Sequence, residues 1–176
     1  MIGLLGLLNL AGAAPTARSA GYVGELVTHP GLFAAAENTI WHQAAHTVVL
    51  GRRFGAFYQH RRHVALFARA EAGYRVTARS GLFVEGFAGV GGQHTILTTA
   101  VYADGADGVE RASHFGQLTV APHAAIGGGV RLRQPEAAPL RIVGRLEGWI
   151  RAPVNRRWLP GVAVQVGVVW TPKART

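Results

Sequence analysis

The chain has 176 residues, which suits one domain, and no cysteine, which excludes disulfides and thiolate metal sites. Its formal net charge is +9, and Lys173 is the only lysine, so arginine carries nearly all of the positive charge. Such a charge suits nucleic acid, anionic lipid or acidic glycans as partners. No basic cluster interleaved with aromatic residues, and no zinc or helix-turn-helix pattern, supports nucleic acid.

The first segment, MIGLLGLLNLAGAAPTARSA, indicates export. An apolar run from Ile2 to Leu10 precedes Ala11-Gly12-Ala13, which fits an A-x-A cleavage signal, although the usual basic region before the run is missing. We expect residues 1–13 to be a signal peptide and residues 14–176 to form one domain. A buried first helix or strand is the alternative. Export argues against nucleic acid and favours lipid or lipopolysaccharide phosphate as the partner of the arginines.

Alternation of apolar and polar residues recurs along the rest of the chain, whereas helical periodicity is scarce. It predicts eight strands, over residues 18–27, 31–40, 46–59, 63–78, 81–97, 114–133, 139–152 and 158–171. The first two strands are the least distinct, because Thr28-His29-Pro30-Gly31 could be a bulge within one long strand. The third strand alternates poorly because Arg52 and Arg53 are adjacent. We expect one of these two arginines at a strand boundary or a bulge.

The fourth strand shows the alternation most clearly. Its even-numbered residues, from Val64 to Ala78, are apolar, whereas Arg69, Glu71 and Arg75 fall on the odd-numbered face. In this and other strands, glycines gather on the polar face: Gly73, Gly81, Gly89, Gly91, Gly127, Gly129, Gly161 and Gly167. We expect these small residues to leave room for long arginine side chains in a narrow interior.

Two architectures could bury such strands. A soluble barrel or sandwich places the apolar face inside, whereas a transmembrane barrel places it against lipid and keeps the polar face in the lumen. Strands 63–78, 81–97 and 114–133 are longer than the roughly 9–11 residues that cross a bilayer when tilted, which favours the transmembrane barrel. Substitution of Arg69 by leucine distinguishes the two, because it should destabilise only the barrel that buries this residue in its lumen.

The connections and the aromatic residues favour the same architecture. The connections at 79–80 and 134–139 are short, whereas 97–114 is long and polar. If the first strand starts in the periplasm, the long loop falls on the cell exterior, as in outer-membrane barrels. Aromatic residues cluster near predicted strand ends, where they would form belts at the membrane interface. These residues are Trp41, Tyr58, Tyr74, Trp149, Trp158 and Trp170.

In these features the sequence resembles the small eight-stranded outer-membrane β-barrel proteins of Gram-negative bacteria, over residues 18–171. The resemblance implies an all-β fold, an eight-stranded antiparallel up-and-down transmembrane β-barrel with a polar, side-chain-filled lumen, located in the bacterial outer membrane. Such barrels commonly end on an aromatic residue. Here Trp170 is followed by TPKART, which implies a short tail.

The charged faces of the strands predict an ion-pair network in the lumen, because lone buried charges are very costly. Its members would be Glu25, Glu37, Arg69, Glu71, Arg75, Glu85, Arg131, Arg141, Arg145, Glu147 and Arg151. Eight strands enclose only enough space for side chains to fill, which favours a structural plug. A narrow anion-attracting pore is the alternative, since arginine outnumbers glutamate.

The predicted function is that of a non-enzymatic, integral outer-membrane protein whose loops serve surface interaction or envelope stability. Arg61, Arg62, Arg156 and Arg157 fall in two outer loops, where they would contact lipopolysaccharide phosphates. The alternatives are a soluble exported barrel that binds a hydrophobic ligand and a lipid A-modifying enzyme. Outer-membrane lipid and lipopolysaccharide are the expected partners, and a protein partner stays unspecified.

Neither catalysis nor a cofactor is expected. Ser113-His114 with Glu110 is the one cluster with catalytic residue types, but adjacent strand residues point to opposite faces. Histidines and aspartates near the predicted loops lack the fixed spacing of metal ligands. These residues are His29, His60, His63, His114, Asp104 and Asp107.

Overall fold

The computed structural model describes residues 16–25, 29–60, 62–98, 102–105, 108–111, 116–132, 140–154 and 157–172. The expected signal peptide, residues 1–13, lies outside the described residues, so its cleavage stays a prediction. A search of the described residues finds no helix that is both long enough and apolar enough to span a membrane.

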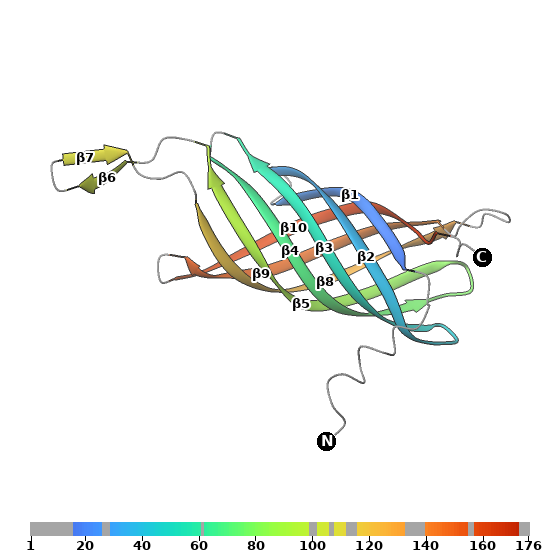
Figure 1. Cartoon of the computed structure of the whole chain (residues 1–176). Helices are drawn as coiled ribbons and strands as arrows, with labels where there is room; N and C mark the ends of the chain where they lie inside the picture. Colours follow the sequence, from blue (N-terminus) through green and yellow to red (C-terminus); the bar gives the residue numbers. More distant parts are fainter. Residues whose placement is uncertain are drawn as a thin grey trace, which may run out of the picture.

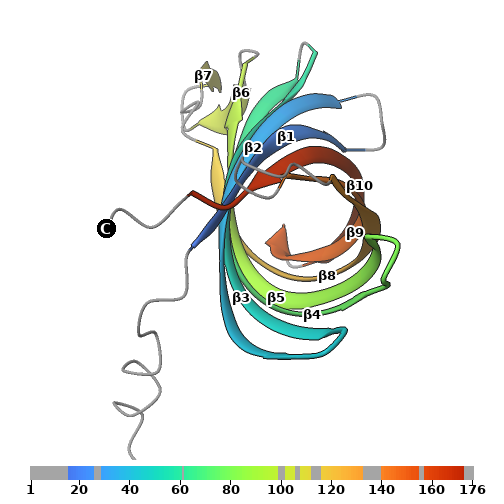
Figure 2. The ribbon, with the colours of Figure 1, turned by 90° about the vertical axis from the view of Figure 1, so that its right-hand side faces the viewer.

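Eight long strands form a closed antiparallel barrel, which Figure 2 shows from one end. The order around the barrel is β1-β10-β9-β8-β5-β4-β3-β2. Barrel strands that follow one another along the chain therefore pair with each other, and the pairing of β1 with β10 closes the barrel. The strands are β1 (Ala17–Glu25), β2 (His29–Gln43), β3 (His46–Gln59), β4 (His63–Thr77), β5 (Leu82–Leu97), β8 (Gln117–Leu132), β9 (Leu140–Val154) and β10 (Arg157–Trp170). The predicted up-and-down barrel and its eight strands, including the separate first two, are confirmed.

A further hairpin lies in the connection between β5 and β8. It consists of β6 (Tyr102–Gly105) and β7 (Gly108–Arg111), which pair with each other in a separate sheet. Figure 1 shows that the hairpin extends beyond one end of the barrel. Sequence reasoning predicted an irregular loop here, because strands of four residues are too short to show a periodic pattern.

The two ends of the barrel differ. The connections β2–β3, β4–β5 and β8–β9 lie at the end where β1 begins and β10 ends, which we call the terminal end. The connections β1–β2, β3–β4, β5–β8 and β9–β10 lie at the opposite end, which we call the hairpin end because it carries β6 and β7. The short connections 79–80 and 134–139 therefore lie at the end opposite the long connection 97–114, as the strand count predicts. The other hairpin-end connections, β1–β2, β3–β4 and β9–β10, are short as well, so only the β5–β8 connection distinguishes the two ends by its length.

The apolar faces of the strands lie on the outside of the barrel. In β4, Leu66 and Tyr74 are exposed on the exterior, whereas Arg69, Glu71 and Arg75 are buried inside. Every other barrel strand exposes large apolar side chains in the same way, among them Leu32, Leu50, Val84, Ile126, Leu146 and Val166. Apolar residues outside and charged residues inside are the pattern of a barrel surrounded by lipid, not by water.

The expectation for Arg52 and Arg53 is wrong. The register of β3 with β4 runs without a break through both residues, and Arg52 pairs with Ala70. Arg53 points inward and is only 1% exposed, so Arg52 points outward from the middle of the strand. The hydrogen-bonded ladders on both sides of β3 hold this alternation. The irregularity of this region lies instead in β2, between Thr39 and Trp41.

Four of the six aromatic residues predicted to form belts lie on the barrel exterior, where a belt would have to be. Trp41, Tyr58, Tyr74 and Trp158 are exposed on the barrel exterior. Trp170 is partly buried at the terminal end. Trp149 is only 3% exposed and lies inside the barrel. Its odd number places it on the inward face of β9 together with Arg145 and Glu147, and this parity overrides its position near the strand end.

Candidate functional site: the barrel interior

A connected set of ion pairs crosses the barrel interior, and we call it the lumen network. It joins residues of β2, β3, β4, β5 and β9. The carboxylates are Glu37, Glu71, Glu85 and Glu147, and the guanidinium groups are those of Arg53, Arg69, Arg75, Arg141 and Arg145. Each arginine supplies a planar fork of donors, so one side chain can hold carboxylates from more than one strand.

Arg145 forms the centre of the network on the terminal side. Its Nε donates to Glu85 at 2.5 Å, its Nη2 to Glu37 at 2.8 Å and its Nη1 to Glu71 at 3.2 Å. Arg75 also bridges Glu37 and Glu85, with distances of 2.8 and 2.7 Å. These contacts tie β9 to β2, β4 and β5 through the interior, in addition to the hydrogen bonds in the wall.

Arg53 forms a second centre, closer to the hairpin end. It donates to Glu71 at 2.9 Å and to the side-chain oxygen of Gln165, and lies 3.7 Å from Glu147. Gln165 in turn donates to Glu147, which also pairs with Arg69. All five side chains are buried, so each charge depends on these partners in place of water.

Aromatic rings complete the surroundings of the arginines. The guanidinium carbon of Arg69 lies 4.4 Å from the centre of the Phe67 ring and 5.0 Å from that of Trp149. That of Arg145 lies 4.0 Å from the centre of the Phe87 ring. Cation–π contacts are strongest where both groups are shielded from water. The rings therefore add to the stabilisation that Arg69 and Arg145 receive from their carboxylate partners.

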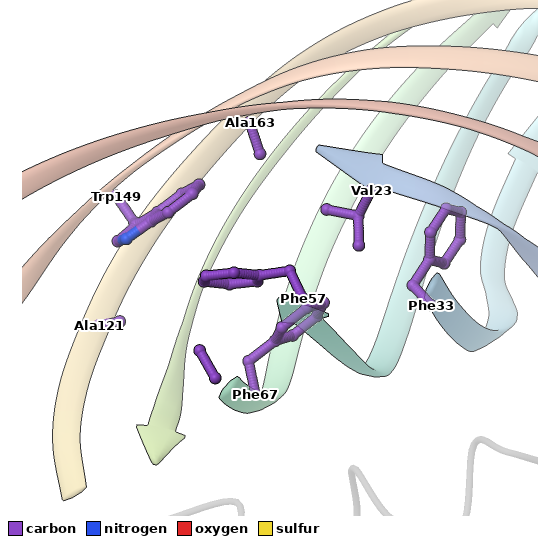
Figure 3. Packing of buried hydrophobic residues seen from close by; sticks show 8 residues of the cluster. Val23, Phe33, Phe57, Phe67, Ala121, Trp149 and Ala163 are labelled. Atoms are coloured by element: carbon purple, nitrogen blue, oxygen red, sulfur yellow. The ribbon is translucent and has the colours of Figure 1, made fainter. Parts of the chain in front are cut away.

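A cluster of buried apolar residues fills the interior on the hairpin side of the lumen network. It comprises Val23, Phe33, Phe57, Ala65, Phe67, Ala121, Trp149 and Ala163. Figure 3 shows Phe57 and Phe67 close together near the middle of this cluster, with Trp149 at one side of it. The lumen thus has a charged middle and an apolar layer on the hairpin side of it, a division that sequence reasoning did not predict.

Glycines of the inner face provide the space that the large side chains occupy. A Cβ atom at Gly91 would lie 2.7 Å from Cγ of Arg69, and one at Gly127 would lie 2.6 Å from Cγ of Arg145. Both separations are too short for real carbon atoms. The prediction that inner-face glycines leave room for arginines is confirmed at these two positions.

Substitution of Gly91 by alanine is expected to destabilise the barrel by about 1–3 kcal/mol, the usual cost of overpacking. The added methyl group would overlap the backbone carbonyl oxygen of Ala68 and lie 2.7 Å from Cγ of Arg69, so both β4 and the Arg69 side chain would have to shift. The adjacent Gly92 points outward, and a Cβ there meets nothing nearer than 3.7 Å. Gly92→Ala is therefore the matched control and should change the unfolding midpoint in guanidinium chloride little. Equal midpoints for the two variants would contradict the packing argument.

The eleven residues predicted to form the lumen network fall into a group of eight, a separate pair and one residue without an ion pair among the described side chains. Glu37, Arg69, Glu71, Arg75, Glu85, Arg141, Arg145 and Glu147 are members of the lumen network. Glu25 and Arg151 form a separate pair at the hairpin end, 3.6 Å apart. Arg131 is exposed at the terminal end and has no ion pair with another described side chain, because it lies beyond the last carboxylates of the network.

Two interior residues that join charges of the lumen network, Arg53 and Gln165, were absent from the network predicted from the sequence. Arg53 was left out because it and Arg52 could not both be assigned to a face, although its odd number matches the inward parity of β3. Gln165 lies on the inward face of β10 between valines, and it links Arg53 to Glu147. An uncharged residue gives no sign in the sequence that it joins two charges.

The predicted lipopolysaccharide contacts are only partly within the described residues. Arg62 is exposed in the β3–β4 turn. Arg61 and Arg156 lie outside the described residues, and the side chain of Arg157, the first residue of β10, is not described. Ser113 and His114 also lie outside. Among the described residues, no three or more His, Asp or Glu side chains group in a way that could hold a metal ion.

A closed barrel with an apolar exterior and a filled, charged interior is a membrane-embedded β-barrel. The fold is similar to the N-terminal β-barrel domain of Pseudomonas aeruginosa OprF, with a TM-score of 0.55, 15% identity, and coverage of 88% of this chain and 95% of that one. It is also similar to Ail, the attachment invasion locus protein of Yersinia pestis, with a TM-score of 0.50, 12% identity, and coverage of 90% and 99%. No family model and no curated protein matches the sequence.

These likenesses show the fold, which is that of the small eight-stranded barrels of the bacterial outer membrane. The apolar exterior of this barrel suits the lipid of that membrane. A soluble barrel would place its apolar side chains inside and its charged side chains in water. Here Arg53 and Glu147 are buried in the interior, which is the reverse of that arrangement.

Proposed function

We propose that the protein is a non-enzymatic, integral outer-membrane β-barrel with a closed lumen, whose hairpin-end loops act at the cell surface. One observation carries this proposal: the interior is filled by ion pairs and aromatic rings, while the longest connection projects beyond the wall at one end only. A filled barrel is a rigid support, so specific interactions fall to its exposed ends.

The packing of the interior supports a plug in preference to a pore. The cavity beside Arg53, Arg145 and Gln165 has a volume of only about 10 Å³. A cavity of this size holds at most a single water molecule. The apolar cluster then follows on the hairpin side, where a hydrated anion would meet Phe57, Phe67 and Trp149. Conduction would therefore require both layers to rearrange together.

The orientation of the barrel follows from the strand count. If the chain enters from the periplasm, β1 begins there and the hairpin end faces the cell exterior. Arg62 then lies at the outer surface, and we propose that it contacts lipopolysaccharide phosphates together with Arg61, Arg156 and Arg157. Arginine suits that role because it binds phosphate oxygens through two donors at once.

Cysteine labelling on intact cells tests this orientation. The chain has no cysteine of its own, so each introduced thiol reports on one position. Asp104→Cys in β6 is expected to react with a membrane-impermeant maleimide on intact cells. Ser80→Cys, in the exposed β4–β5 turn at the terminal end, is the matched control and should react only after the outer membrane is opened. Labelling of Ser80→Cys but not Asp104→Cys on intact cells would invert the orientation and refute the proposed surface role.

A further inference from the structure

A cavity of about 890 Å³ opens at the terminal end of the barrel, and we call it the vestibule. The charged and titratable side chains that line it are all basic: Arg75, Arg79, Arg131, Arg141 and His42. None of the described residues that line the cavity is an aspartate or a glutamate. Its size is in the range of small-molecule binding sites.

Two of these arginines lie directly opposite each other. Arg131 of β8 and Arg141 of β9 are cross-strand partners on the inner face. Like charges in this position destabilise a sheet unless a counter-charge lies between them. Arg141 contacts Glu37 at 3.4 Å, but Arg131 has no ion pair with another described side chain. The barrel therefore holds a positive charge at its mouth that the lumen network does not neutralise.

A third arginine is held close to this pair by a fixed turn. Arg79 lies in the β4–β5 turn, where the backbone N–H of Gly81 donates to the carbonyl of Ala78 at 2.9 Å. The backbone N–H of Arg131 donates to the carbonyl of Gly81 at 2.8 Å, which joins the turn to β8. Gly81 has a φ of +90°, a conformation that favours glycine. The cations are thus presented by ordered backbone.

The vestibule also offers neutral hydrogen-bond donors, and its floor is closed. Four threonines line it beside the arginines: Thr39, Thr47, Thr77 and Thr171. The hydroxyl group of Thr47 lies 3.0 Å from Nδ1 of His42. Arg75, at the floor, remains bound to Glu37 and Glu85. The vestibule is therefore a blind pocket above the lumen network. Arg79 and Arg131 form no ion pair with another described side chain, so their guanidinium groups are suited to the oxygens of a multiply charged anion.

We propose that the vestibule is a binding site for phosphate-bearing anions, with Arg131 and Arg79 as the principal ligand-binding residues. This role goes beyond the surface function proposed above and does not depend on the orientation of the barrel. Two sources could supply the chemistry: a soluble phosphorylated compound, or the headgroup phosphate of an anionic lipid at the barrel rim.

Calorimetric titration of the full chain with pyrophosphate, in a neutral detergent, tests the site. Saturable binding is expected, and Arg131→Gln and Arg79→Gln should each weaken it by roughly tenfold, as the loss of a charged hydrogen bond implies. Arg18→Gln is the matched control, because it removes the same charge at the same end of the barrel. Arg18 points outward from β1, at the position opposite Trp170 of β10 in the strand register. It therefore lies outside the vestibule, and its substitution should not change the affinity for pyrophosphate.

The same titration in lipid nanodiscs distinguishes the two sources. If a lipid headgroup occupies the vestibule, pyrophosphate should bind more weakly in phosphatidylglycerol discs than in phosphatidylcholine discs. Equal affinity in both kinds of disc assigns the site to a soluble anion. Failure of pyrophosphate to bind in neutral detergent would overturn the proposal, as would an equal loss of affinity in Arg131→Gln, Arg79→Gln and Arg18→Gln. Each variant is first shown to be folded by its mobility in unheated SDS gels.

Discussion

Replacing Arg53 with leucine is expected to destabilise the barrel by about 3–5 kcal/mol, the cost of removing one partner from a buried ion pair. Arg53 is one of the most deeply buried side chains in the structure. It donates to Glu71 at 2.9 Å and to Gln165, and it lies 3.7 Å from Glu147. Leucine restores none of these contacts and leaves part of the space empty.

The measurement is an unfolding titration in guanidinium chloride, with the protein inserted in lipid vesicles and tryptophan fluorescence as the signal. The double variant Arg53→Leu/Glu71→Leu is the informative companion. Once one charge of a buried pair is gone, removing the other costs less than it would in the intact pair, so the two changes together should cost clearly less than the sum of the single changes. Additive effects would show that Arg53 and Glu71 do not stabilise each other and would contradict the lumen network at this position.

The adjacent substitution, Arg52→Leu, is expected to act in the opposite direction. Arg52 points outward from the middle of β3, next to Ala70 of β4. A lipid-facing arginine near the bilayer centre costs about 2–4 kcal/mol, less if its side chain reaches towards the headgroups. Leucine removes that cost and adds to the apolar exterior, so the variant should be more stable than the wild-type protein in vesicles by up to this amount.

Arg52→Leu and Arg53→Leu form a matched pair, because the same side chain is replaced at neighbouring positions of one strand. Both are measured in the same vesicles and compared with the wild-type unfolding midpoint. A stabilised Arg52→Leu together with a destabilised Arg53→Leu is the result that an inward Arg53 and a lipid-facing Arg52 require. Destabilisation by Arg52→Leu of the same size would mean that Arg52 has a structural partner on the exterior.

The sequence predicts this fold well because a lipid-facing barrel imposes a strict period of two on every strand. In β4, the alternation of Leu66 and Tyr74 with Arg69, Glu71 and Arg75 assigns each side chain to the correct face. Such a pattern depends only on local geometry, and the ladder of hydrogen bonds extends it to the whole wall.

The parts that the sequence did not predict depend on contacts between distant strands. Arg53 and Glu147 are brought together by barrel closure across the interior, and Gln165 joins them without any charge of its own. Tryptophan is a residue type typical of membrane interfaces, yet the parity of Trp149 in β9 places its ring inside the barrel, 5.0 Å from the guanidinium carbon of Arg69. Arg131 has the inward parity but lies beyond the carboxylates of the lumen network. Alternation predicts the face on which a residue lies and not its position along the barrel axis, so this could not be predicted.

The central claim is that the apolar face of a closed barrel contacts lipid, and mobility in SDS gels tests it most directly. The membrane fraction is loaded with and without prior boiling. A closed barrel with buried ion pairs should resist SDS, migrate as a fast band without boiling, and shift to a slower band after heating. Recovery of the protein in the soluble periplasmic fraction, with the same mobility before and after boiling, would contradict the lipid-facing exterior.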